Sequence, residues 1–339
     1  MRAARWLVLV VAVVGLGCGK KGPAPAGAAP ESGQYLPAEA AGYFELDVKA
    51  LMASSLIQPL RDKMLEQVPP ACRPLVDRTE RLVLALYGSP DALLGGMFGA
   101  RDEEYGDEPG EGEGRAEEPA SPMPDMALLL KGPAAADLRS CLDGLAKEGD
   151  QPVREEERNG RKILFGGRGE QFALVSPTDT VHVMCTVPRL DAVLATMAGG
   201  PSIEGSELLK TMATMSSGAI VGALLIPESV AAMMTEGFAM FAGDKPVPAP
   251  RSAALSIGLG DAVTVAAAMT FTDEAGAQGL LDIANGLIGA AKAAMAMAGA
   301  DNPEAAPYKR MLDSLSLSRS GATLTGRISI SGDLLKMLL

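Results

Sequence analysis

The pattern of apolar and polar residues predicts a folded body of mixed strands and helices that begins near Gln34. Strict alternation with a period of two, as over residues 42–48, is typical of a half-buried strand. Apolar residues three and four positions apart, as at Leu138, Cys141 and Leu145, are typical of a helix with one face on a core. Both periods recur along the chain, so we expect strands and helices in comparable amounts.

These periodicities define the predicted elements. Strands are expected at residues 42–48, 81–87, 126–131, 153–158, 161–165, 171–175, 180–187, 219–226, 253–259, 262–271, 315–317 and 322–330. Helices are expected at 49–56, 58–67, around Leu138, and at 189–197, 206–215, 228–241, 272–297, 308–312 and 333–339. Hairpins alternate with helices without regular βαβ units, which predicts an α+β fold with antiparallel sheets.

Turn residues separate the predicted strands. Asn159-Gly160 is a strong signal for a two-residue hairpin, and Gly260-Asp261 separates another pair of strands. A turn is also expected around Pro177-Thr178-Asp179, which makes residues 153–187 an antiparallel meander. The Pro-rich residues 245–250 are expected to be a connection.

The order of elements divides the body into two halves, 34–200 and 201–339. A similar succession of strand, helices, strands and helix occurs in each, so two similar halves are an alternative to one undivided domain. Residues 95–124 are rich in Gly, Glu, Asp and Pro, and we expect them to form a disordered acidic insertion within the first half.

The first 17 residues have the pattern of an export signal. Arg2 and Arg5 precede a short apolar run, and Gly15-Leu16-Gly17 ends it. The run is shorter than the roughly 20 residues that span a bilayer. Cys18 follows, so the segment resembles the lipobox of bacterial lipoproteins, although Gly15 occupies the place usually held by Leu. An ordinary secretory signal followed by an unrelated cysteine is the alternative.

The resemblance to lipoproteins implies lipid attachment at Cys18. Residues 18–33 are rich in Gly, Ala and Pro, which indicates a flexible tether. By the same resemblance, Gly19 after the lipidated cysteine implies the periplasmic face of the outer membrane in a diderm cell. The body, with Tyr35-Leu36-Pro37 and Ser54-Ser55-Leu56, is similar to uncharacterised lipoproteins of GC-rich bacteria, which imply no site residues.

The net charge argues against nucleic acid as a partner. The whole chain carries −12, and loss of Arg2 and Arg5 with the signal leaves 28 basic against 42 acidic residues, or −14. Nine acidic residues lie between Asp102 and Glu118 against the single Arg115. A solvated loop is the expected reading of that segment, because it lacks the ligand pattern of a calcium loop.

Three cysteines follow Cys18 in a compartment where disulfides form. We expect one bridge, between Cys72 and Cys141, because both lie in or beside predicted helices. Cys185 lies in an apolar strand pattern and is expected to be a buried free thiol.

The sequence contains no recognisable catalytic or metal motif. The single histidine, His182, lies in a predicted strand, and a structural hydrogen bond is its expected role. The segment 166–169 lacks the rest of a phosphate-binding loop, and no zinc-ligand spacing is present. The methionines, such as Met212 and Met215, fit core packing better than Cu(I) binding. A third interpretation is that they line an adaptable pocket for an apolar ligand. We therefore expect no catalytic residues, cofactor or metal.

These observations favour a non-catalytic module that is anchored to a membrane by lipid and binds an apolar ligand or an envelope protein. Two alternatives stay open at this point. One is an envelope hydrolase whose catalytic residues are dispersed in the sequence, and the other is a structural envelope protein.

Overall fold

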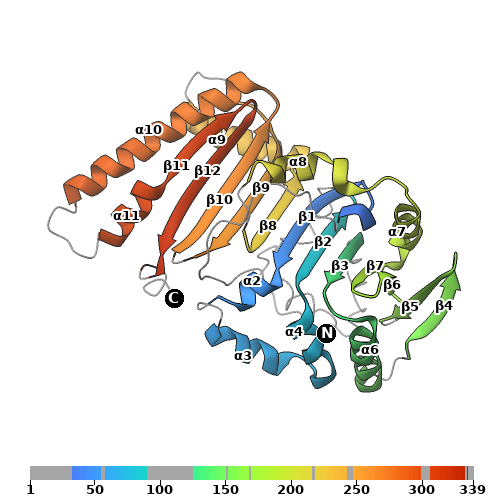
Figure 1. Cartoon of the computed structure of the whole chain (residues 1–339). Helices are drawn as coiled ribbons and strands as arrows, with labels where there is room; N and C mark the ends of the chain where they lie inside the picture. Colours follow the sequence, from blue (N-terminus) through green and yellow to red (C-terminus); the bar gives the residue numbers. More distant parts are fainter. Residues whose placement is uncertain are drawn as a thin grey trace, which may run out of the picture.

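The computed structural model describes residues 33–54, 58–89, 125–149, 152–167, 169–215, 218–242, 247–260, 262–298, 306–332 and 334. The predicted signal, the tether up to residue 32, the acidic insertion and most of the predicted terminal helix lie outside them. The described strands form a 12-stranded sheet with helices packed on it, in which every pairing is antiparallel (Figure 1). The fold is therefore α+β.

The elements follow the predicted order closely. The strands are β1 (Ala40–Asp47), β2 (Arg81–Tyr87), β3 (Asp125–Lys131), β4 (Arg154–Arg158), β5 (Arg161–Gly166), β6 (Phe172–Thr178), β7 (Val181–Thr186), β8 (Ile220–Leu225), β9 (Pro250–Leu259), β10 (Ala262–Phe271), β11 (Ser316–Ser320) and β12 (Thr323–Ser331). The α-helices are α2 (Val48–Met52), α3 (Gln58–Gln67), α4 (Arg73–Arg78), α6 (Ala135–Gly149), α7 (Leu190–Met197), α8 (Glu207–Ala213), α9 (Glu228–Ala242), α10 (Glu274–Ala298) and α11 (Ala306–Ser314). Short 3-10 helices are η1 (Gly33–Tyr35), η2 (Pro70–Cys72), η3 (Val187–Arg189) and η4 (Ile203–Gly205).

The two predicted halves meet in the middle of one continuous sheet. Across the sheet the order is β11-β12-β10-β9-β8-β1-β2-β3-β7-β6-β5-β4. Outward from the central β1–β8 pair, one side follows β1-β2-β3-β7-β6 and the other follows β8-β9-β10-β12-β11 in the same topological order. The β4–β5 hairpin is additional on the first side. Both halves therefore share one sheet. The sequence pattern predicts the strands of each half but does not show that the two groups join.

The largest core lies between one face of this sheet and the helices α7 and α8. Tyr43 and Val183 from the strands, Val193 of α7 and Leu208 of α8 belong to one buried cluster. Each is at most 1% exposed, and burial of such a side chain contributes about 1.5–3 kcal/mol. The helices are held because their apolar stripes, which the sequence pattern predicts, fill this face.

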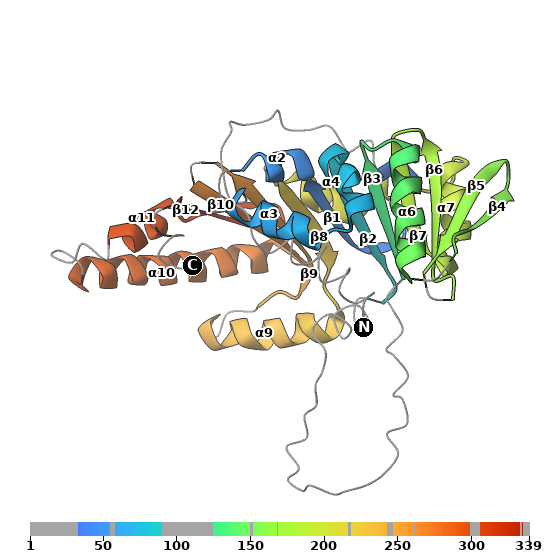
Figure 2. The same cartoon turned by 90° about the horizontal axis from the view of Figure 1, so that it is seen from below.

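Smaller clusters lie on the opposite face. Leu51 of α2 packs with Leu46 and Ile220 near the central strand pair. Farther out, Val68 packs with the two cysteines that join η2 to α6. In Figure 2, α2, α3 and α4 lie on the upper side of the molecule, whereas α9 and α10 lie on the lower side.

The edge hairpin β4–β5 forms where Asn159-Gly160 predicts it. Both residues have positive φ, 53° and 71°, as a two-residue turn of this kind requires. The edge strand β4 has the sequence Arg-Glu-Glu-Glu-Arg, and its ends lie opposite Phe165 and Arg161. Charged side chains on an edge strand discourage pairing with another chain.

Two predicted turns are wrong in detail. Pro177 and Thr178 belong to β6, because a register shift between Val175 and Thr178 lets the strand continue past the proline. Pro250 is the first residue of β9 rather than part of a connection, a position where its missing N–H costs no ladder hydrogen bond.

Candidate functional site

The structure describes three of the four cysteine residues. Cys18 lies outside the described residues. Cys72 and Cys141 are joined by a disulfide with 4.5 Å between their Cα atoms. Cys185 is a free, buried thiol on β7, and burial raises its pKa to about 12. That thiol is uncharged at neutral pH, so it lacks the thiolate that cysteine chemistry requires.

His182 lies on β7 and hydrogen-bonds on both sides of its ring. Ser176 Oγ is 2.7 Å from Nδ1, and the Pro133 carbonyl oxygen is 3.0 Å from Nε2. Because a carbonyl only accepts, Nε2 carries the proton and Nδ1 accepts from the exposed Ser176 hydroxyl. No sequence motif indicates this pairing of Ser176 with His182. Both bonds tie neighbouring segments together, which is the structural role expected for His182.

A shallow depression of about 240 Å³ lies beside the start of α2. Its lining includes Lys49, Glu80 and Arg81. Lys49 pairs with Glu80, which lowers the pKa of that carboxyl, and Arg81 pairs with Glu45 at 3.1 Å. Burial raises the pKa of Glu45 although Arg81 opposes that rise. These charges satisfy one another, so the depression offers little unpaired charge to a ligand.

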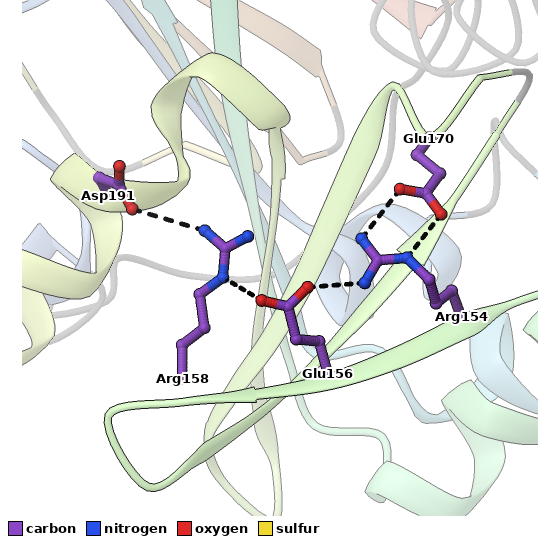
Figure 3. Close-up of polar contacts among 5 residues, drawn as sticks. All are labelled: Arg154, Glu156, Arg158, Glu170 and Asp191. Carbon is purple, nitrogen blue, oxygen red and sulfur yellow. Dashed lines mark hydrogen bonds and ion pairs between the residues drawn. The ribbon is translucent and has the colours of Figure 1, made fainter.

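A second polar cluster covers the edge of the core at the β4–β5 hairpin (Figure 3). Arg154 donates to both oxygens of Glu170, at 2.6 and 2.9 Å, and also to Glu156. Arg158 bonds the other oxygen of Glu156 and lies 3.8 Å from Asp191 on α7. Hydrogen bonds from Arg158 and Arg154 lower the pKa of Glu156 to about 2. Through Asp191 and Glu170, this network connects the hairpin to α7 and to the loop before β6.

The guanidinium of Arg154 also stacks on an aromatic ring. Its carbon lies 4.2 Å from the centre of the Phe165 ring, which is buried in the main core cluster. The network therefore shields an apolar edge from water, and this contact accounts for its charges without a ligand.

An apolar surface lies on the second half of the sheet. In an antiparallel pair, residues directly opposite each other point to the same face. Leu255 of β9 lies opposite Ala267 of β10, and Ala267 lies opposite Gly326 of β12. We call this surface the Leu255 face. It consists of Ala253, Leu255 and Ile257 of β9, Val265, Ala267 and Met269 of β10, and Leu324 and Ile328 of β12.

The two faces of β9 and β10 differ in their burial. On the face that α8 covers, Ser252, Ala254 and Ser256 are each at most 4% exposed. On the Leu255 face, Leu255 is 43% exposed, Ala267 is also exposed, and the other members are half-buried. A leucine in the interior of a wide sheet is usually covered, so this face is only partly closed.

The apolar surface continues across the centre of the molecule. Gly222 of β8 lies opposite Leu255 on one side and opposite Phe44 of β1 on the other. A Cβ atom at Gly222 would lie 2.4 Å from Cδ1 of Phe44, so the ring lies across the glycine. Phe44 is half-buried, and Leu84 of β2 is its partner on the next strand. The apolar surface thus continues from the Leu255 face across β8 and β1 to β2.

The methionines lie in two kinds of environment. Met212 and Met215 pack against the main core cluster, as expected for core packing. Met233, Met240 and Met297 are 69%, 80% and 84% exposed. Among the described residues, no three His, Cys, Asp or Glu side chains come together as a metal site would require.

Comparison with known proteins gives a distant likeness in fold. No family model matches the chain, and no curated protein matches it. Two crystal structures of a protein named TP0453, forms I and III, are similar over 91% of this chain and 96% of theirs. Their TM-scores are 0.44 and 0.46, at 10% and 9% sequence identity. Likeness at this level assigns neither a family nor a function.

The Leu255 face could be predicted only in part from the sequence. The alternation in β9, where Leu255 and Ile257 alternate with Ala254 and Ser256, indicates two faces of different character. It does not show that the bulkier face is the open one, because the position of α8 decides which face is buried. Small residues, Ser and Ala, are enclosed here, and large aliphatic ones are left partly exposed.

Proposed function

We propose that this chain is a non-catalytic interaction protein of the bacterial envelope, anchored by lipid at Cys18 on the periplasmic face of the outer membrane. It binds a partner protein through the Leu255 face. The partial exposure of Leu255 within a run of apolar side chains is the observation that carries this proposal. A contiguous exposed apolar patch is typical of an interaction site.

The shape of this face favours a protein partner over a small apolar ligand. Small-molecule sites are concave and enclose most of their ligand. The Leu255 face is the surface of a sheet, and its members come from three neighbouring strands. A broad apolar surface of this kind suits a partner that covers it with a helix or with another sheet.

The proposal is tested by photocrosslinking of the full chain in a diderm envelope. A photoreactive residue in place of Leu255 is expected to give a discrete protein adduct. The same residue in place of Val187, which is 36% exposed on η3, serves as the control. Ala267→Lys should abolish the adduct from position 255, because it places a charge on the adjacent strand of the same face.

A stable fold must accompany that loss. Ala267 is exposed, so its substitution should change stability by about 0.5 kcal/mol or less, and the melting curve checks this. Equal labelling from positions 255 and 187, in a chain that carries lipid, would contradict the proposed binding surface.

The pairing of Ser176 with His182 is the one observation that favours a hydrolase. An exposed hydroxyl that donates to a histidine is the arrangement of an activated nucleophile. A panel of ester substrates compared between the wild-type chain and Ser176→Ala distinguishes this function. Turnover that disappears in the variant would replace the proposed binding role by an enzymatic one.

A further inference from the structure

Helix α10 is largely exposed although its composition is apolar. The stretch Glu274–Met297 has the length and composition of a membrane-spanning helix, and an apolar window of 18 residues within it contains no buried residue. The helix also contacts α9, α11 and the strands β10, β11 and β12. Because those contacts hold it against the body, it suits the surface of a bilayer better than its interior.

The exposed apolar residues of α10 form a stripe. Leu287, Ala290, Ala294 and Met297 are all exposed, and their spacing of three and four residues places them on one side of the helix. Ala284, Ile288 and Met295, on another side, are half-buried. The helix therefore has one apolar side toward the protein and a second toward solvent, an arrangement that a water-soluble helix normally avoids.

Helix α9 repeats this pattern. Met233 and Met240 lie two turns apart on the same side and are 69% and 80% exposed. Ala231, on the opposite side, is buried. The two helices contact each other, and both lie on the lower side of the molecule in Figure 2.

The start of the described chain lies at the end of the sheet where both helices begin. The start of β1 is beside the end of β8, with Gly42 opposite Leu224, and α9 follows β8. The end of β10 is beside the start of β9, with Phe271 opposite Pro250, and α10 follows β10. Residue Gly33, which precedes β1 by a few positions, therefore approaches the fold from this end.

The length of the preceding segment limits its distance from the membrane. Only 14 residues lie between Cys18 and Gly33. If these residues act as the proposed tether, a segment of that length would span roughly 20 Å on average. Lipid on Cys18 would keep the first turns of α9 and α10 close to the bilayer for most of the time.

We propose that α9 and α10 lie in the interfacial layer of the membrane that holds the lipid anchor, with Met233, Met240, Leu287 and Met297 directed toward the acyl chains. This inference rests on the proposed anchoring at Cys18. Apolar burial drives the contact. The two helices contribute the acidic residues Glu228, Glu236, Glu274 and Asp282 against Lys292, so anionic headgroups do not attract them.

The experiment uses the full chain, processed and lipidated in a diderm host and reconstituted into phosphatidylcholine vesicles. Met240→Cys and Leu287→Cys are each labelled with an environment-sensitive fluorophore. Lys162→Cys on β5, whose side chain is 77% exposed, is the matched control. The native cysteines should not react, because Cys72 and Cys141 are bonded and Cys185 is buried.

The expected result is a blue shift at positions 240 and 287, with several-fold quenching by lipids that carry a spin label at shallow depth. Position 162 should remain in water. High salt should leave the signals unchanged, and adding phosphatidylglycerol should not strengthen them. Water-like emission at both helix positions, in a chain whose intact mass shows lipid, would overturn this inference and leave the anchored interaction protein standing.

Two other outcomes also decide against it. A blue shift that appears in detergent and grows with protein concentration would assign α9 and α10 to a contact between copies of the chain. A chain without lipid on Cys18 would overturn the anchoring in the proposed function and this inference together.

Discussion

At the scale of single residues, Gly222 controls how the apolar side chains lie on the centre of the sheet. A methyl group there would meet the Phe44 ring at 2.4 Å, well inside van der Waals contact. The glycine therefore lets an aromatic ring on one strand lie across its neighbour, which is a common reason for glycine within a strand.

We predict that Gly222→Ala destabilises the protein by about 1–3 kcal/mol, since the Phe44 ring must leave its position. Chemical denaturation measures this change. Gly258→Ala is the matched control, because its Cβ would have no neighbour closer than 3.7 Å. Combining Gly222→Ala with Phe44→Ala should remove most of the clash, so a full, additive penalty in the double variant would refute this explanation.

At the scale of elements, the edge strand β4 depends on charged side chains, whereas its partner β5 is held by the apolar burial of Ile163 and Phe165. Strand β4 carries Arg154, Glu156 and Arg158 on the side of the main core, and Glu155 on the other side pairs with Arg139 of α6. These pairs are exposed, so each is weak alone, and the joint network holds the hairpin in place.

The stability of this hairpin should depend on pH. The Glu156 pKa is about 2 in the folded chain against an ordinary value of 4.5, so its pairing stabilises the hairpin above pH 4.5. That contribution is lost as the pH falls from 4.5 toward 2. Amide exchange should therefore accelerate in β4 and β5 over this range before it does in the central strands.

Arg154→Gln provides the control for that titration. It removes a hydrogen bond to Glu156, so the Glu156 pKa should move up toward its ordinary value and the loss of protection should begin at higher pH. Uniform exchange across all strands at every pH would show that the hairpin has no separate dependence on these charges.

At the scale of the whole molecule, the disulfide links distant parts of the sequence. Cys72 in η2 and Cys141 in α6 are 69 residues apart, and the segment between them includes two strands of the sheet. Closing a loop of this length in the unfolded chain stabilises the fold by about 4 kcal/mol in the chain-entropy model.

We therefore predict that the paired change Cys72→Ser with Cys141→Ser lowers the free energy of unfolding by about 4 kcal/mol. Urea denaturation measures it, and the reduced wild-type chain should behave like the variant. Cys185→Ser is the comparison, because it replaces a buried thiol that forms no bond. Equal stability of the paired variant and the oxidised wild type would show that the bridge contributes little.

The sequence predicts individual elements better than their assembly. The short apolar run at residues 81–87 identifies β2 to the residue, and Asn159-Gly160 locates a hairpin turn, because both signals are local. The pairing of β1 with β8 brings together residues about 180 positions apart, and no local pattern encodes it. The alternation in β9 indicates two different faces, but no local pattern shows that the Leu255 face is the exposed one, because its exposure depends on where distant helices pack.

The central β1–β8 pair has a consequence for how the chain folds as it is synthesised. The first half of the chain emerges ahead of the second, so β1 can pair with β2 while its other edge still lacks β8. An unpaired edge in the middle of a future sheet is a template for other chains. Until β8 pairs with β1, this open edge leaves the first half of the chain exposed to aggregation.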